Sequence, residues 1–147
     1  MTYFNNKLDF TDEADGLTEE NIGSKGTGIA KAVLNDRATF FNSIASLVSG
    51  KKVLDVGCNN GRWMSWLLDQ NASHVVGIDS DSGVIGVANT HLQEYFATSK
   101  YTLAISRWED YTAPADIDVV FCAGMIHLGT TQSTLITKLA SFGDKLI

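Results

Sequence analysis

Cysteine and proline are scarce in this chain of 147 residues, which contains two cysteines and one proline. Cys58 and Cys122 lie far apart and form no CxxC pair, which argues against a disulfide framework and against a zinc site. Their apolar neighbours favour small thiols in the core or in the wall of a pocket. Apolar runs such as 119–123 are far too short to span a bilayer, and the N-terminus lacks the basic start and apolar run of a signal peptide. We therefore expect a cytoplasmic protein with no membrane partner.

Positive charge is also in the minority. The chain has 11 Lys and Arg residues against 17 Asp and Glu residues, which gives a net charge of −6. An acidic chain repels phosphate backbones, and Lys51–Lys52 is the sole adjacent basic pair, so nucleic acid is a poor candidate partner. Hydrophobic residues make up 44% of the sequence, which is enough to bury a core within one domain.

Short β-branched runs alternate with segments of helical periodicity along most of the chain. This alternation predicts a three-layer α/β/α Rossmann-like fold with a mostly parallel sheet, truncated after the fifth strand. We interpret residues 1–50 as an N-terminal lid segment and helix, and residues 51–147 as the core of a single domain overall. The expected strands are 52–57, 74–79, 101–106, 118–123 and one that starts at 145, and the expected helices are 27–48, 61–70, 84–98 and 132–142.

Two acidic residues follow buried strands at points where a ligand is expected. The segment 53–61, VLDVGCNNG, lies where the first strand turns into a helix, which is the ligand crevice of an open parallel sheet. Asp55 precedes the first glycine by two residues, where a carboxylate would repel the pyrophosphate of a dinucleotide but suit an ammonium group. Asp79 ends the second strand in GID and can accept both hydroxyls of a ribose. S-adenosylmethionine combines a ribose with an ammonium group and a sulfonium, so it fits both acids.

The ordered motifs VLDVGCNNG, GID, an acidic segment at 107–110 and DVVFCAGMIHL resemble those of the class I S-adenosylmethionine-dependent methyltransferases. The resemblance covers about residues 53–147. It implies S-adenosylmethionine as cofactor and methyl transfer to a small molecule or another acceptor. It also implies that Asp55 orients the methionine moiety, that Asp79 holds the ribose and that Ser80 lies beside the adenine. The other implied cofactor contacts are Gly57, Cys58, Asn59, Gly61, Trp108, Glu109 and Cys122.

Three further residues have competing interpretations. His127 follows the fourth strand at the mouth of the crevice and is a candidate general base, although the family often carries a histidine here without a catalytic role. Trp63 and Trp66 are expected to pack in the core rather than to stack on a ligand.

The sequence departs from the family pattern in two ways. Asn59 stands where the family usually has glycine, but asparagine tolerates a left-handed backbone better than most residues. The family usually continues past the fifth strand, whereas this chain ends at Ile147, as a shortened or minimal version would. The fifth strand would then be an exposed edge, which predicts pairing with a second copy of the chain.

Two functions stay open on the sequence alone. The chain is either a methyltransferase or an S-adenosylmethionine-binding module that needs a partner or a missing C-terminal part for activity. A third interpretation, an NAD-type Rossmann domain, is disfavoured by Asp55 and Asn59. The segment FCAGMIHL is also similar to a subgroup that transfers a carboxymethyl group to tRNA, although the acidic charge argues against it.

Overall fold

The computed structural model describes residues 41–123, 125 and 132–147. It divides into two units, Met1–Ser46 and Leu47–Ile147, and apart from the helix that ends at residue 48 the account that follows concerns the second. Residues 41–48 are helical, as expected for the end of the helix 27–48, and Gly50 follows with a φ of 71°. The rest of that helix and the expected lid lie outside the described residues.

Five parallel strands form one sheet with the order β3-β2-β1-β4-β5. The strands are β1 (Lys52–Val56), β2 (His74–Asp79), β3 (Tyr101–Ile105), β4 (Val119–Phe121) and β5 (Lys145–Leu146). The apolar, β-branched runs of β1, β2 and β4 are buried almost throughout, as is usual for strands covered on both faces. The predicted parallel Rossmann-like sheet is confirmed. The chain order reverses between β1 and β4, and a crevice at the carboxyl ends of these strands is the expected ligand site.

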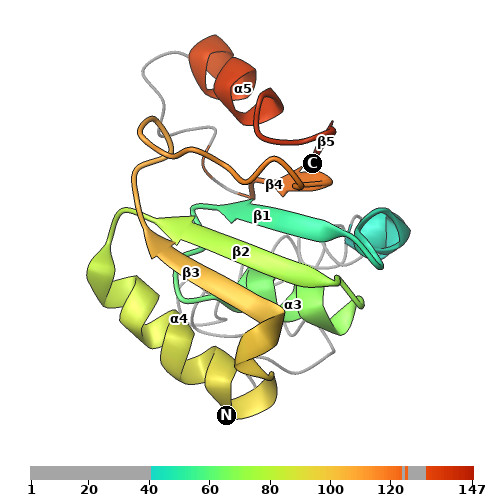
Figure 1. Ribbon diagram of the computed structural model, residues 1–147, viewed down its shortest axis with the longest axis vertical. Helices are drawn as coiled ribbons and strands as arrows, with labels where there is room; N and C mark the ends of the chain where they lie inside the picture. The colour runs from blue at the N-terminus through green and yellow to red at the C-terminus, as the bar shows by residue number, and fades with distance from the viewer. Residues whose placement is uncertain (1–40, 124, 126–131) are drawn as a thin grey trace, which may run out of the picture. The chain divides into compact units, whose positions relative to one another are not determined.

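Three helices cover the two faces of the sheet (Figure 1). They are α3 (Arg62–Asp69), α4 (Ser82–Tyr95) and α5 (Gln132–Ala140). In Figure 1, α3 and α4 lie on one side of the sheet and α5 lies on the other, which gives the three expected layers. A cluster of buried residues joins α5 to one face through Leu54, Val76 and Val120 on the strands and Leu135 and Leu139 on the helix. Each such side chain stabilises the fold by roughly 1.5–3 kcal/mol through burial.

The helix α4 differs from the sequence prediction at both ends. It begins at Ser82 instead of residue 84, because the Asp81 side chain caps it by accepting hydrogen bonds from the amides of Gly83 and Val84. It ends at Tyr95, because the backbone of Phe96 is extended, with a φ of −131° and a ψ of 143°. A short 3₁₀ turn, η2 (Thr98–Lys100), then leads into β3. The buried stripe of the helix is Ile85, Ala88 and Leu92.

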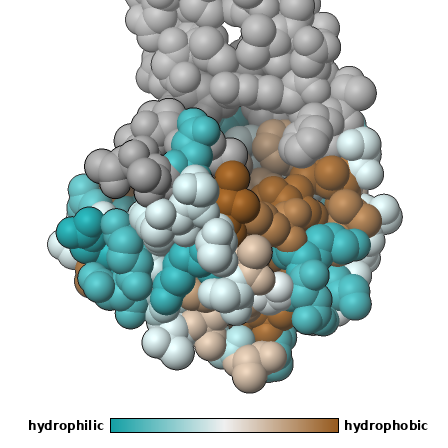
Figure 2. Space-filling view, turned by 90° about the horizontal axis from the view of Figure 1, so that it is seen from above, coloured by the Kyte–Doolittle hydropathy of each residue, from teal (hydrophilic) through white to brown (hydrophobic). Residues whose placement is uncertain are grey.

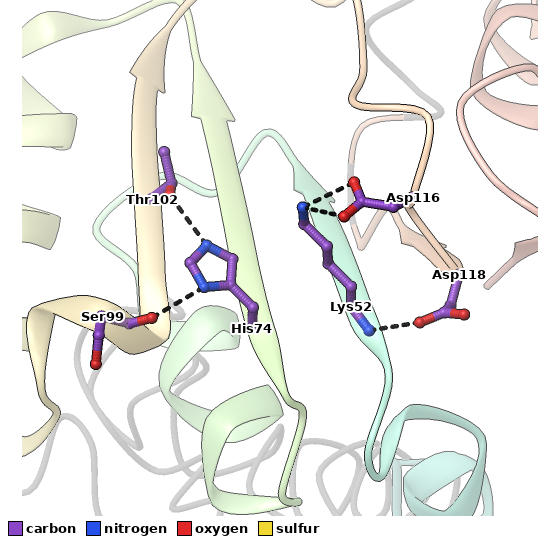
Figure 3. Close-up of polar contacts among 6 residues, drawn as sticks. All are labelled: Lys52, His74, Ser99, Thr102, Asp116 and Asp118. Carbon is purple, nitrogen blue, oxygen red and sulfur yellow. Dashed lines mark hydrogen bonds and ion pairs between the residues drawn. The ribbon is translucent and has the colours of Figure 1, made fainter.

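Matched charges and hydrogen bonds tie the strand beginnings together at the N-terminal edge of the sheet (Figure 3). Lys52 Nζ lies 2.8 Å from both carboxylate oxygens of Asp116, and the Lys52 amide donates to Asp118 at 2.7 Å. The two ring nitrogens of His74 lie 3.1 Å from the Ser99 carbonyl oxygen and 3.0 Å from Thr102 Oγ1. The contacts at this edge therefore stabilise the sheet.

The strand β5 lies at one end of the sheet as the structure describes it. It pairs with β4 alone, and Leu146 in it is 36% exposed. Ile136 on the neighbouring helix α5 is 46% exposed. In the view from above, hydrophobic side chains gather in one area beside hydrophilic ones (Figure 2).

Candidate functional site

The turn between β1 and α3 adopts a left-handed backbone at three positions. The φ angles are 76° at Gly57, 48° at Asn59 and 81° at Gly61. The left-handed conformation expected of Asn59 is therefore present. Gly61 also lies against α4, since a Cβ there would be 3.1 Å from the Cβ of Ala88. The glycines thus serve both the turn and the packing of two helices.

Each backbone amide of this turn already donates a hydrogen bond within the protein. The amides of Gly57 and Cys58 donate to the Ile78 carbonyl at 2.9 and 3.0 Å, and the Gly61 amide donates to the Cys58 carbonyl at 2.9 Å. The Asn59 amide donates to Asp79 Oδ2 at 3.0 Å, and the Asn60 amide donates to the Asn59 side chain at 2.6 Å. A pyrophosphate bound at such a turn needs amide donors. The groups that this turn presents to a ligand are therefore carboxylates rather than free amides.

Two carboxylates lie beside the turn. Asp55 is 1% exposed, and its Oδ2 is buried without a hydrogen-bond partner. Burial, together with the nearby charge of Asp79, raises the pKa of Asp55 to about 8. Asp79 ends β2 and accepts from the Asn59 and Asp81 amides, both at 3.0 Å. A cationic group next to Asp55 would favour its ionised form and satisfy the buried oxygen.

A cavity of about 670 Å³ opens at the carboxyl ends of β1, β2, β3 and β4. Its volume lies within the range of roughly 300–1,000 Å³ that small-molecule sites occupy. The walls come from each of these strand ends, as the fold predicts. The lining residues are Val56, Gly57, Asn59, Trp63, Ile78, Asp79, Ser80, Ser106, Arg107, Trp108, Glu109, Ala123 and Met125.

Most of the predicted site residues meet at this cavity. Those in its walls are Gly57, Asn59, Asp79, Ser80, Trp108 and Glu109.

Four predicted contacts lie behind the walls. They are Asp55, Cys58, Gly61 and Cys122, none of which lines the cavity. Cys58 is 1% exposed, and burial is the main cause that raises its thiol pKa. Burial, with the charge of Asp55, raises the pKa of Cys122 to about 11. Neither thiol is therefore a ready nucleophile near neutral pH. His127, the predicted base, lies outside the described residues.

The cavity includes residues that sequence reasoning did not assign to it. Trp63 was expected in the core with Trp66, yet it lines the cavity, whereas Trp66 is 5% exposed and buried as expected. The helical period gave no reason to separate the two, because they lie three residues apart on similar faces. The other additions are Val56, Ile78, Ser106 and Met125. Arg107 and Ala123 also line the cavity, and both lie in segments that the resemblance already places beside the cofactor.

A comparison with protein families identifies the family of the chain. The family model described as "Methyltransferase domain" matches residues 53–142, which include β1, the turn and both acids. The chain belongs to this methyltransferase family. The predicted resemblance to class I methyltransferases is thereby confirmed.

Curated relatives of this methyltransferase domain are similar over its core. It is 39% identical over 89 residues to a ubiquinone biosynthesis O-methyltransferase from Azoarcus sp. (strain BH72), over 60% of this chain and 38% of that protein. It is 40% identical over 95 residues to the protein of that name from Thiobacillus denitrificans, over 63% of this chain and 40% of that protein. The chain thus spans about two fifths of the length of these relatives.

Solved structures share the fold of the methyltransferase domain. The magnesium protoporphyrin IX methyltransferase of Synechocystis PCC 6803, solved with bound SAM, matches with a TM-score of 0.64 at 23% identity. That match covers 92% of this chain and 68% of the other. An S-adenosylmethionine-dependent methyltransferase from Mesorhizobium loti matches with a TM-score of 0.56 at 20% identity, over 65% of this chain and 43% of the other.

Two negative findings apply to the residues that the structure describes. Among them, no group of three or more His, Cys, Asp or Glu side chains is arranged to hold a metal ion. No helix within the same residues is long and apolar enough to cross a membrane.

Proposed function

We propose that this methyltransferase domain binds S-adenosylmethionine in the 670 Å³ cavity and transfers its methyl group to a small molecule. The bound cofactor supplies an electrophilic methyl group on a positively charged sulfur. The residues of the chain bind and orient it and exclude water, which are the main requirements of methyl transfer. The absence of a strong acid–base pair among the described wall residues agrees with such a reaction.

The orientation of the cofactor follows from the positions of the two acids. The lone pairs that the backbone leaves available on Asp79 would accept the ribose hydroxyls. The adenine would then extend toward Ser80, Trp108 and Glu109, and the amino acid part toward Gly57, near the buried Asp55 that lies outside the cavity wall. His127 keeps its proposed role as a base for the acceptor.

The observation that carries the proposal is that the backbone amides of the turn are already hydrogen-bonded, while two carboxylates, Asp55 and Asp79, lie beside it. The five amides from Gly57 to Gly61 already have acceptors, so the turn cannot bind a pyrophosphate as an NAD-binding turn does. The buried, partnerless oxygen of Asp55 favours a ligand that brings a cation. The names of the two curated relatives, ubiquinone biosynthesis O-methyltransferase, support a small-molecule acceptor.

Calorimetric titration with S-adenosylmethionine, S-adenosylhomocysteine and NAD tests the binding step. We expect both sulfur-containing ligands to bind and NAD to bind at least tenfold more weakly. Absence of binding by the first two ligands would overturn the proposal. Transfer of a labelled methyl group to a panel of small hydroxylated acceptors tests the reaction, and binding without any transfer would favour the module without complete activity.

Two predictions about the molecule's surroundings stay open to experiment. A homo-oligomer formed through the edge of β5 would have a multiple of the chain mass in light scattering, and a mass equal to one chain would exclude it. Cytoplasmic location and the lack of a nucleic-acid partner stay predictions from the sequence.

A further inference from the structure

Trp63 is a large aromatic residue in the wall of the cavity. It lies in the first turn of α3 and lines the cavity, although three residues later Trp66 is buried. Its ring centroid lies 6.2 Å from that of Phe121 on β4, with the planes tilted by 55°. The guanidinium carbon of Arg62 lies 5.8 Å from the Trp63 ring centroid. These two contacts hold the indole in place beside the ends of β1 and β4.

The proposed cofactor orientation leaves one part of the cavity for the acceptor. The ribose, adenine and amino acid parts use Asp79, the wall after β3 and the turn after β1. In this orientation the sulfonium would lie between the ribose and the amino acid parts, and its methyl group would face the wall that remains. Besides the strand-end residues Val56 and Ile78, the wall that remains consists of Trp63, Ala123 and Met125. An acceptor must approach the methyl group along these residues.

The chemistry of this wall limits the acceptor. Its residues are apolar, and an indole favours stacking against another flat ring. Arg107 is the sole basic residue among the described lining residues, and it lies 3.0 Å from Glu109 in an ion pair. Asp55 and Asp79 add negative charge nearby. An anionic acceptor would therefore meet carboxylates without a spare cation in the described wall.

We infer that Trp63 is a specificity-determining residue that seats a planar, uncharged aromatic acceptor beside the transferable methyl group. The inference rests on the proposed function, because the cofactor orientation defines which wall faces the acceptor. Stacking of this kind favours an aromatic ring over an aliphatic one by about three- to tenfold in affinity.

A binding experiment with three matched probes tests this inference. The protein is saturated with S-adenosylhomocysteine, which blocks turnover, and is then titrated with catechol, cis-cyclohexane-1,2-diol or 3,4-dihydroxybenzoate. The diol removes the aromatic ring and the benzoate adds a negative charge. We expect catechol to bind at least about fivefold more tightly than either of the other two. If catechol binds no more tightly than the diol, or does not bind at all, the inference that the acceptor is a planar ring is wrong. If the benzoate binds as tightly as catechol, the inference that the acceptor is uncharged is wrong.

Variants assign the effect to Trp63. We expect Trp63→Leu to lose about three- to tenfold in catechol affinity and Trp63→Phe to retain most of it. Tyr95→Leu removes an aromatic ring that is 53% exposed and outside the cavity, so it should bind catechol as the parent chain does. Affinity for S-adenosylhomocysteine should stay within about twofold in Trp63→Leu, which also shows that the variant folds. Unchanged catechol affinity in Trp63→Leu overturns the inference, whereas failure of the parent chain to bind S-adenosylhomocysteine overturns the proposed function instead.

Discussion

The backbone amide of Asn59 donates a hydrogen bond to Asp79 Oδ2 at 3.0 Å, and this bond joins the turn after β1 to the end of β2. The other carboxylate oxygen of Asp79 accepts from the Asp81 amide at the start of α4. One side chain thus fixes two loops of the cavity and keeps lone pairs for a ligand. Cavity shape and ligand recognition are therefore coupled through Asp79.

This coupling predicts that Asp79→Asn weakens both binding and folding. The variant keeps one acceptor oxygen, and its amide nitrogen would face a backbone donor. We expect S-adenosylhomocysteine affinity to fall by about 10- to 100-fold, the equivalent of one charge-assisted hydrogen bond, and stability to fall by about 1 kcal/mol. Calorimetry and urea unfolding measure the two effects. Asp144→Asn removes the same charge from an exposed residue outside this cavity and should change neither.

The raised pKa of Asp55 predicts a stability that falls as the pH rises. The folded chain holds this proton up to a pKa of about 8, mainly because Asp55 is buried, whereas the unfolded chain releases it near the ordinary value of 3.8. Between these values the folded state binds more protons, so the stability that the group contributes is full below about pH 4 and lost as the pH passes 8.

Asp55→Asn should therefore stabilise the chain at high pH. We expect the variant to gain on the order of 2 kcal/mol over the parent at pH 9 and little at pH 5, because asparagine mimics the protonated acid. Urea unfolding at the two pH values measures this difference. The same variant should bind S-adenosylhomocysteine more weakly, because the ligand's ammonium group loses its carboxylate. A gain of equal size at both pH values would contradict the assignment.

The sequence predicted the sheet well because its signals are local. The bounds of β2 match at both ends, and β1 starts at the predicted residue. The alternation of short β-branched runs with helical periods determines a parallel sheet largely independently of distant contacts. The helix α4 was placed less accurately because its start depends on a side-chain cap at Asp81 and its end on the extended backbone of Phe96.

The sequence predicted the two acids and part of the cavity wall, but it missed wall residues such as Trp63 and Met125. Asp55 and Asp79 follow strands whose carboxyl ends meet, which a sequence pattern can reveal. The saturated amides of the turn and the exposure of Trp63 depend on β2 and β4, which lie far away in the sequence. The helical period of α3 does not distinguish Trp63 from Trp66. Tertiary contacts alone decide which of the two is buried and which lines the cavity.

Gly57 and Gly50 form a matched pair for backbone substitution. Both have positive φ angles, 76° and 71°, so alanine is strained at each by about 1–2 kcal/mol. A Cβ at Gly50 meets nothing within 4 Å, whereas one at Gly57 would lie 2.7 Å from Met125 Cγ. We expect Gly57→Ala to cost about 1–3 kcal/mol more than Gly50→Ala in urea unfolding. Adding Met125→Ala should remove that excess, and an excess that persists in the double variant would exclude the clash as its cause.

The cap of α4 offers a further test of the local structure. Asp81 accepts from Gly83 and Val84 amides at 2.7 and 3.4 Å, so Asp81→Ala should destabilise the chain by about 1 kcal/mol. Asp81→Asn keeps an acceptor oxygen and should cost a few tenths of a kcal/mol at most. Thermal or urea unfolding compares the two, and equal losses would mean that charge, not capping, accounts for the effect.

The strand β1 separates two opposite electrostatic arrangements. At its beginning, Lys52 lies 2.8 Å from Asp116, while near its other end Asp55 lies under the influence of a like charge on Asp79. The strand is five residues long, so the two ends lie roughly 13 Å apart and substitutions there should have additive energies. Selection, or an engineer, can thus reinforce one end to offset the folding cost of recognition at the other. The tolerance of the ligand site to change is set partly by residues that never approach the ligand.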